Sequence, residues 1–122
     1  MQTSTRSRGQ QAETLALDYL KQHKLQLLCK NYRGRFGEID LIMRDTQHII
    51  FVEVRYRSST DPVHPLETID AHKQGRIIRT SQGFLQRYHA KYPEHDYRFD
   101  VVTITGDTGK AKIDWIQNAF GA

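Results

Sequence analysis

The feature that most constrains this chain is a pair of apolar segments separated by a short polar turn. Residues 38–43 (EIDLIM) and 48–56 (HIIFVEVRY) are rich in β-branched residues, and residues 44–47 (RDTQ) join them. Segments of this length and composition predict two antiparallel strands of a buried sheet, paired as a hairpin. The rest of the fold must pack against this hairpin.

Charged side chains lie inside both predicted strands. Because side chains alternate between the two faces of a strand, Glu38 and Asp40 share one face of the first strand. Glu53 and Arg55 likewise share one face of the second strand. The turn allows two registers, of which one places Asp40 diagonal to Glu53 and the other places them directly opposite. In both registers the two carboxylates lie on the same face of the hairpin.

Two carboxylates this close need a cation between them, or one must take a proton. Directly opposite residues have Cβ atoms about 4.5–5.5 Å apart, a distance at which like charges repel. Mg²⁺ prefers oxygen ligands and commonly binds one or two carboxylates together with waters and a substrate phosphate. An ion held by Asp40 and Glu53 could activate a water and bind a phosphate, with the cationic Arg55 beside it. The pattern is sufficient for metal-assisted hydrolysis of a phosphodiester.

A solvated strand face is the alternative interpretation of these charges. Antiparallel strands with one wet face alternate polar and apolar residues, and Glu38 could form a cross-strand ion pair with Arg55. Against this, Ile42, Ile49 and Phe51 share the face of the acidic residues, which predicts that this face is partly buried. Because buried carboxylates without partners are unfavourable, the sequence favours a cleft or a site at the rim of the core.

The remaining segments predict a single mixed arrangement of helices and strands. Within one of the later strands, Asp100 lies on the same side as Arg98, and we expect a structural ion pair there. The order is α-β-β-β-α-β-β, an α/β (α+β) fold with a central mixed sheet flanked by helices in two or three layers. Besides the hairpin, the predicted segments are a helix over 9–23, a strand over 25–32, a loop over 57–68, a helix over 69–88, strands over 98–104 and 111–116 around a turn at 106–109, and an irregular end over 117–122.

Length, charge and cysteine content narrow the class of protein. The 122 residues predict one domain over 9–122, with residues 1–8 as a flexible arm. The single Cys29 excludes an intramolecular disulfide, and no apolar run approaches the roughly 18 residues of a membrane span. We therefore expect a cytoplasmic protein without a membrane partner. The formal charge of +4 permits binding to a polyanion but does not require it.

A basic ridge recurs on the second predicted helix. Lys73, Arg76 and Arg79 follow one another every three residues, and Arg87 lies two turns further along. Together with Arg55 and Arg57, this ridge could follow a phosphate backbone, and each contact would add salt-sensitive affinity. An ordinary solvated helix face is compatible with the same spacing.

The hairpin sequence resembles a known family. GEIDLI followed by FVEVR is similar to the YraN-like family of bacterial proteins, as are NYR at 31–33, RFDVV at 98–102 and the closing NAF. That family is similar to Holliday junction resolvases and to the wider restriction-endonuclease-like PD-(D/E)XK superfamily. The resemblance implies a restriction-endonuclease-like central mixed sheet and an activity on DNA, including branched DNA.

The resemblance also implies roles for individual residues. Asp40 and Glu53 stand at the metal-binding positions of the superfamily motif, with Mg²⁺ or Mn²⁺ as cofactor, and Arg55 stands where lysine is usual. Glu13 matches an acidic residue of the first helix that assists metal binding in resolvase-like enzymes. The basic ridge and Arg57 become candidate contacts to nucleic acid.

Three functions remain open on the sequence. The first is a metal-dependent endonuclease in which Arg55 positions water or phosphate. The second is a catalytically weak or inactive DNA-binding module, because Arg55 stays protonated in a protein and cannot deprotonate a water. The third is a protein-interaction scaffold without a nucleic-acid role. Resolvase-like relatives dimerise to cut two strands symmetrically, so the first function implies a homodimer.

Overall fold

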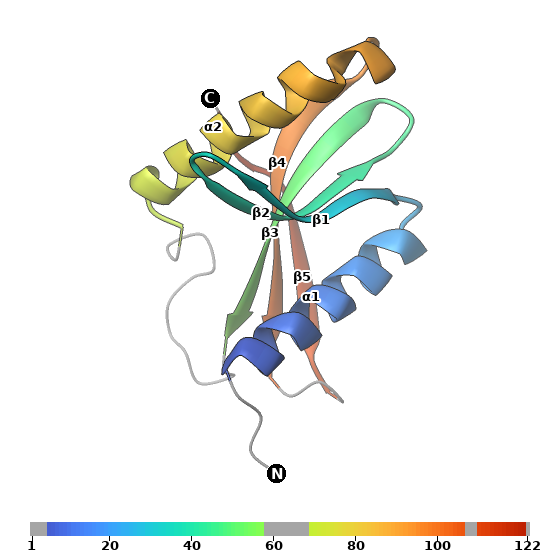
Figure 1. Cartoon of the computed structure of the whole chain (residues 1–122). Coiled ribbons are helices and arrows are strands. Elements are labelled where there is room, and N and C mark those ends of the chain that lie inside the picture. Colours follow the sequence, from blue (N-terminus) through green and yellow to red (C-terminus); the bar gives the residue numbers. More distant parts are fainter. Residues whose placement is uncertain (1–4, 58–68, 107–109, 122) are drawn as a thin grey trace.

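The structure, a computed structural model, describes residues 5–57, 69–106 and 110–121. Five strands form one mixed sheet between two α-helices (Figure 1). The order α-β-β-β-α-β-β is the one predicted from the sequence. No helix in the described part of the chain is long and apolar enough to cross a membrane. The elements are α1 (Thr5–Gln22), β1 (Gln26–Gly34), β2 (Gly37–Arg44), β3 (His48–Arg57), α2 (Ala71–Tyr88), the 3₁₀ helix η2 (His89–Lys91), β4 (Asp96–Thr105) and β5 (Lys112–Phe120).

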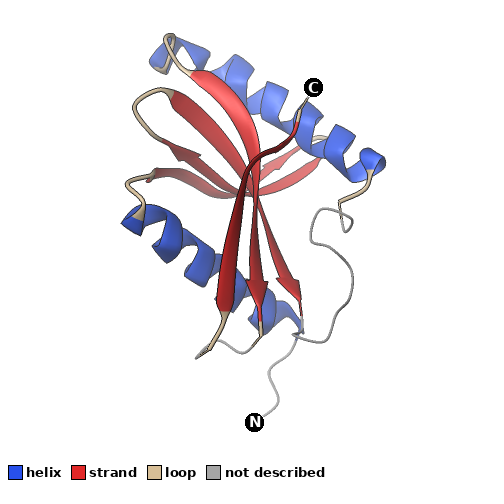
Figure 2. Ribbon diagram, turned by 180° about the vertical axis from the view of Figure 1, so that it is seen from behind, coloured by secondary structure: helices blue, strands red, loops and turns tan. Residues whose placement is uncertain are grey.

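The strands lie in the order β1-β2-β3-β4-β5 across the sheet, which is also their order along the chain. Neighbouring strands are antiparallel except β3 and β4, which are parallel. A parallel pair cannot be joined by a tight turn, and the chain between β3 and β4 contains α2, which crosses one face of the sheet (Figure 2). The sheet is mixed, as predicted.

Two separate hydrophobic cores lie on the two faces of the sheet. One core contains Ala16 and Leu20 of α1 together with Val52 of β3. The other contains Phe84 of α2 and Phe51 of β3, whose ring centroids are 5.9 Å apart. Val52 and Phe51 are adjacent in the chain and belong to different cores, as strand alternation requires. The fold has three layers, with one helix on each face of the sheet.

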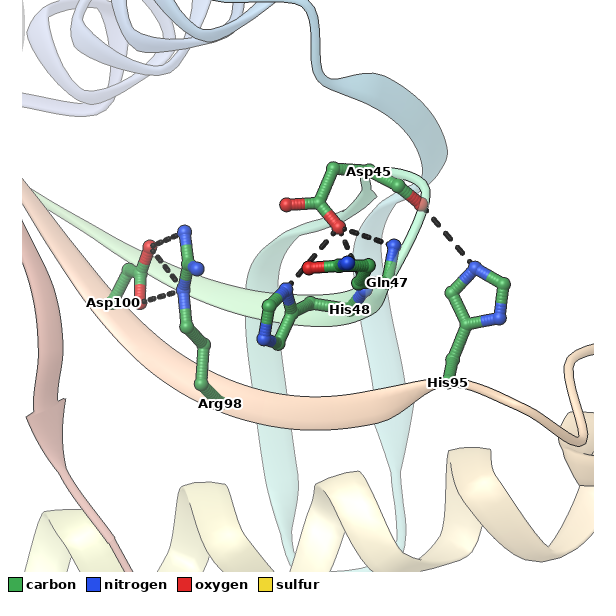
Figure 3. A network of polar contacts seen from close by, with 6 residues as sticks. All are labelled: Asp45, Gln47, His48, His95, Arg98 and Asp100. Atoms are coloured by element: carbon green, nitrogen blue, oxygen red, sulfur yellow. Dashed lines mark hydrogen bonds and ion pairs between the residues drawn. The ribbon is translucent and has the colours of Figure 1, made fainter.

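The turn between β2 and β3 is held by Asp45, whose carboxylate accepts the N–H groups of Gln47 at 2.8 Å and His48 at 2.7 Å (Figure 3). Burial alone would raise the pKa of Asp45, but these hydrogen bonds and the His48 ring lower it below its ordinary value. The Asp45 N–H donates to the His48 carbonyl at 3.1 Å, so residue 45 pairs with residue 48. This pairing fixes the register of the hairpin.

Asp100 is fully buried in β4 and is surrounded by donors. Arg98 Nε donates to its Oδ1 atom at 3.1 Å (Figure 3), and Trp115 Nε1 donates to its Oδ2 atom at 2.8 Å. The N–H of Asn118, a residue with a positive φ of 52°, also donates to Oδ1 at 2.9 Å. The expected structural ion pair is confirmed, and the same carboxylate supports an irregularity in β5.

The ends of the first helix and of the long loop differ from the sequence prediction. The helix begins at Thr5, so residues 5–8, expected in the flexible arm, form its first turn. This turn contains no apolar residue, so hydrophobic periodicity could not reveal it. Arg57, expected in the loop, is the last residue of β3. Residues 58–68 of that loop and 107–109 of the predicted last turn lie outside the described residues.

All five strands are longer than their predicted segments, and β4 begins at Asp96 instead of Arg98. β1 continues to Gly34 instead of ending near Tyr32. β5 continues to Phe120, which pairs with Phe99, although this end was expected to be irregular. The positive φ of Asn118 interrupts the two-residue alternation that marks a strand, so the sequence pattern was broken where the strand continues.

The tip of the β1–β2 hairpin lies close to α2. A Cβ atom added at Gly34 would come within 3.2 Å of Thr80 Cγ2 in the helix, so glycine permits this approach. Gly37 has a φ of 151°, which L side chains rarely adopt. Arg76 Nε donates to the Phe36 carbonyl at 3.1 Å and connects the helix to the tip. This contact holds α2 beside the acidic residues of β2.

Candidate functional site

The two central acidic residues of the hairpin face each other at the end of the β2–β3 ladder. The ladder pairs Leu41 with Val52, and one step further in this register places Asp40 directly opposite Glu53. The N–H of Val54 donates to Asp40 Oδ2 at 2.8 Å, so the backbone of β3 holds this carboxylate in position. Of the two registers that the sequence left open, the structure has the one with directly opposite carboxylates.

Glu53 is the most deeply buried acid of this site, with 6% of the residue exposed. Its Oε1 atom lies 3.3 Å from Lys73 Nζ and 3.5 Å from Arg55 Nη2. Its Oε2 atom is buried and has no hydrogen-bond partner among the residues that the structure describes. Burial and the charge of Asp40 raise the pKa of Glu53 to about 7, against the lowering effect of the two cations. An orphaned carboxylate oxygen of this kind is expected of a group that binds a cation.

Asp40 and Glu13 also have raised pKa values. For Asp40, burial raises the pKa, and a backbone hydrogen bond and nearby cations only partly offset this effect. For Glu13 in α1, burial raises the pKa first, and the charges of Asp40 and Glu38 add to it. Carboxylates that resist ionisation because they are buried together gain stability from a bound cation.

Asn31 connects the acidic residue of α1 to the hairpin. With its amide oriented to suit its neighbours, the Asn31 nitrogen donates to Glu13 Oε1 at 2.7 Å and to Glu38 Oε1 at 3.0 Å. Asn31 has a positive φ of 51°, which asparagine tolerates better than most residues. Glu38 also pairs with Arg33 at 3.4 Å, instead of the Arg55 partner of the solvated-face interpretation. Sequence reasoning gave Asn31 no role in the site, and the available signal was its position in the NYR segment that resembles the family.

Glu38, Asp40 and Glu53 line a cavity of about 250 Å³ between strands β2 and β3 and helix α2, and we call it the acidic cavity. Among the described residues, no set of three or more His, Cys, Asp or Glu side chains lies close enough to hold one ion. The candidate ligands are therefore two carboxylates from β2 and β3, with space for waters and a phosphate, which suits Mg²⁺ or Mn²⁺. The walls are Gly37, Glu38, Asp40, Glu53, Lys73, Arg76 and Ile77.

The predicted basic residues separate into groups in the structure. Lys73 and Arg76 line the acidic cavity, where Lys73 contacts Glu53 directly. Arg79, one turn further along α2, lines a second cavity. Arg57 is the last residue of β3. The spacing of the basic residues along α2 predicts that Lys73 contacts nucleic acid. The packing of α2 also brings Lys73 to the carboxylate of Glu53.

Comparison with known proteins identifies the family of the chain. A model of the uncharacterised protein family UPF0102 matches residues 12–104, a span that includes Glu13, Asp40, Glu53 and Lys73. The chain belongs to this family. The resemblance to YraN-like proteins predicted from the hairpin sequence is thereby confirmed.

Individual UPF0102 proteins match this chain over nearly its whole length. A UPF0102 protein of Nitrosomonas europaea is 47% identical over 118 residues, which cover 97% of each chain. A UPF0102 protein of Stutzerimonas stutzeri is 43% identical over 118 residues, covering 97% of this chain and 98% of the relative. One from Pseudomonas aeruginosa is 44% identical over 121 residues, covering 98% of this chain and 96% of the relative.

The acidic cavity of this UPF0102 protein combines opposed carboxylates with cations. Asp40 and Glu53 present hard oxygen ligands from two adjacent strands. Lys73 and Arg55 place positive charge beside Glu53, within 3.5 Å of its Oε1 atom. Such an arrangement can bind a divalent ion together with a phosphate group, or a phosphate group through the cations alone.

Proposed function

We propose that this protein is a metal-dependent DNA endonuclease in which Asp40 and Glu53 bind Mg²⁺ or Mn²⁺. The observation that carries the proposal is the pair of opposed carboxylates with raised pKa values, one of which has a buried oxygen without a described protein partner. Lys73, a cation suited to phosphate, lines the same cavity. When bound, the ion would activate a water and neutralise the charge that develops on the phosphate.

The protein itself fixes both carboxylates. The Val54 N–H orients Asp40, and contacts from Lys73 and Arg55 orient Glu53. Both acids belong to strands of a buried sheet, so their separation is set by the β2–β3 ladder. Side chains held by regular elements keep a productive geometry better than side chains on loops. The pair is therefore preorganised to present its carboxylate oxygens to a cation at a constant spacing.

Lys73 supplies the amine that is missing from the motif in this chain. The superfamily motif has lysine where this chain has Arg55, whose charge is spread over a planar group and cannot be removed. Lys73 Nζ reaches Glu53 from α2 at 3.3 Å, so an ammonium group approaches the same carboxylate from another element. We assign to Lys73 the holding of the attacked phosphate and its water, and to Arg55 the partial neutralisation of Glu53.

Glu13 supports the site from α1 in this proposal. It is not a wall of the acidic cavity, and it connects to the hairpin through the amide of Asn31, which also binds Glu38. A carboxylate in this position can hold a water at the edge of the cavity. Glu13 therefore acts on Asp40 through its charge and is not a direct ligand, so its removal should weaken metal binding less than removal of Asp40.

DNA is the proposed substrate, and branched DNA its proposed form. The basic residues Arg76 and Arg79 continue along α2 from the acidic cavity, and Arg57 ends the strand that carries Glu53. The similarity of YraN-like proteins to junction resolvases adds to this support. Symmetric cleavage of a four-way junction needs two sites, so we propose a homodimer for that reaction, acting in the cytoplasm.

Cleavage assays test this function. Labelled linear, flapped and four-way DNA is incubated with Mg²⁺ or Mn²⁺, with EDTA as the metal-free reference. Wild type should cleave, and Asp40→Asn or Glu53→Gln should lower the rate about 100-fold or more, because several kcal/mol of transition-state stabilisation depend on the ion. Asp18→Asn and Glu94→Gln remove exposed acids in the same way and should cleave normally. Cleavage that survives both cavity substitutions would rule this mechanism out.

A DNA-binding module without hydrolysis is the second candidate. It is favoured by Arg55 at the position of the motif lysine and by the exposed arginines of α2. It predicts salt-sensitive DNA binding that weakens when Arg76 and Arg79 are replaced by alanine, with no cleavage in either metal. A protein-interaction scaffold would bind neither DNA nor RNA at low salt. A binding measurement beside each cleavage assay separates these outcomes.

A further inference from the structure

A second and larger cavity lies between the tip of the β1–β2 hairpin and α2, and we call it the arginine cavity. Its volume is about 630 Å³, and its walls include four arginines and no acidic residue. Arg33 and Arg35 come from the tip of the β1–β2 hairpin, and Arg79 and Arg87 come from α2. Arg33 pairs with Glu38, whereas the other three have no carboxylate within 4.0 Å in the described part of the chain. This lining suits a ligand with several negative charges.

Phe36, a residue that is 46% exposed, lines the arginine cavity. The guanidinium carbons of Arg79 and Arg35 lie 5.4 Å and 5.7 Å from the ring centroid. The Phe36 carbonyl accepts a hydrogen bond from Arg76 Nε at 3.1 Å, so α2 holds this part of the tip in place. An exposed ring with guanidinium groups nearby and its backbone held by α2 offers a surface on which an unstacked base can lie.

The two cavities adjoin along α2. Arg76 lines the acidic cavity and donates to the carbonyl of Phe36, which lines the arginine cavity. From Lys73 to Arg87 the helix rises about 21 Å, at 1.5 Å per residue. That length corresponds to roughly six nucleotides of one strand at 3.4 Å each. A single strand could contact the arginines and present a phosphate to the carboxylates at the same time.

We propose that the arginine cavity binds a single-stranded segment of DNA, with phosphates on the arginines and an unstacked base on Phe36. In a duplex the faces of the bases are buried in the stack, so a duplex cannot use the ring. The inference rests on the proposed endonuclease function and specifies its substrate. The cleaved phosphate would lie next to an unpaired strand, as in a flap or an opened junction arm.

Binding in EDTA tests the arginine cavity without cleavage. Fluorescence anisotropy measures the affinity for a short labelled single strand and for the same strand in a duplex. The single strand should bind more tightly, and Phe36→Ala should weaken its binding about tenfold while duplex binding stays unchanged, because one base stack is lost. Phe36→Trp should restore the affinity. A nucleoside monophosphate should compete weakly; full competition would identify a mononucleotide site and overturn the proposal.

The phosphate contacts have a separate test. The double variant Arg79→Ala/Arg87→Ala should lower the slope of log affinity against log salt by about 1.4, since each contact to a single strand contributes about 0.7. The matched control Lys21→Ala/Lys112→Ala removes the same charge from exposed positions on α1 and β5, and should leave the slope unchanged. Equal losses in the two double variants would indicate a general charge effect and overturn the site.

Cleavage of flapped DNA separates this inference from the proposed function. Phe36→Ala should raise KM and leave kcat nearly unchanged, whereas Glu53→Gln should lower kcat about 100-fold or more and retain binding. Absence of cleavage by wild type in either metal, together with lost single-strand binding in Phe36→Ala, would refute the endonuclease and support the strand site. Wild-type single-strand binding by Phe36→Ala would refute the strand site and leave the endonuclease standing.

Discussion

Replacing Glu53 by glutamine is the sharpest physical test of the acidic cavity. Glu53 is 6% exposed, and burial together with the charge of Asp40 raises its pKa from 4.5 to about 7. Glutamine has nearly the same shape but cannot ionise, so the substitution removes the charge without emptying the site. Its amide oxygen can still accept a hydrogen bond from Lys73 at the position of Oε1.

The sign of the effect follows from comparing the folded and unfolded chain. Glu53 ionises near pH 4.5 when unfolded and near pH 7 when folded. Because the folded pKa is the higher one, the contribution of Glu53 to stability is fully present below pH 4.5 and is lost as the pH rises through 7. A folded pKa of about 7 against 4.5 in the unfolded chain, at about 1.4 kcal/mol for each pH unit between them, corresponds to about 3.5 kcal/mol in all, of which about 3 kcal/mol is lost between pH 4.5 and about pH 8.

Urea unfolding in EDTA, near pH 4.5 and again near pH 8, measures this contribution. Relative to wild type, Glu53→Gln should gain about 3 kcal/mol of unfolding free energy between these conditions, or roughly 10 °C in Tm. Glu94→Gln removes an exposed acid and should change by less than about 0.5 kcal/mol. If the unfolding free energies of wild type and Glu53→Gln change with pH in parallel, the raised pKa of Glu53 is refuted.

Three further measurements address the metal, the cations and the hairpin tip. Mn²⁺ should raise the Tm of wild type above about pH 7 and lose this effect as Glu53 takes up its proton, since only the carboxylate binds the ion; an equal rise in Glu53→Gln would contradict this. In cleavage assays, Lys73→Ala should lower the rate about 100-fold and Arg55→Lys should change it little; a rate gained in Arg55→Lys would show a degenerate site. In urea unfolding, Gly83→Ala should stabilise the protein by about 0.5–1 kcal/mol and Gly34→Ala should not, because only Gly34 has a side chain of α2 at 3.2 Å; equal effects would argue against close packing at the tip.

The shared face of Asp40 and Glu53 could be predicted because it depends only on strand alternation. Both registers allowed by the short turn keep the two carboxylates on one side. Choosing between the registers needs one more signal, the Asp45 carboxylate that accepts the N–H groups of Gln47 and His48. Aspartate is favoured at the first position of a tight turn, so this choice lay within reach of sequence reasoning.

The contact between Lys73 and Glu53 could not be predicted in the same way. The two residues belong to different elements, and their distance depends on how α2 packs against the sheet. The spacing of basic residues along a helix identifies a charged side, but not which residue meets a carboxylate. The arginine cavity has the same origin, since Arg76 and Phe36 are 40 residues apart in the chain and meet only through tertiary packing.

Both proposed sites depend on how α2 packs against the sheet, and the hydrogen bond from Arg76 to the Phe36 carbonyl lies between them. On one side of this contact α2 carries Lys73 to Glu53, and on the other side it carries Arg79 to the exposed ring of Phe36. An α-helix keeps the spacing of its side chains, so a strand bound to its arginines is automatically oriented towards the carboxylates. In the proposed function, recognition of an unpaired strand and placement of the cleaved phosphate therefore follow from a single helix position. A displacement of α2 would impair both, so in this proposal the helix couples recognition of the strand to its cleavage.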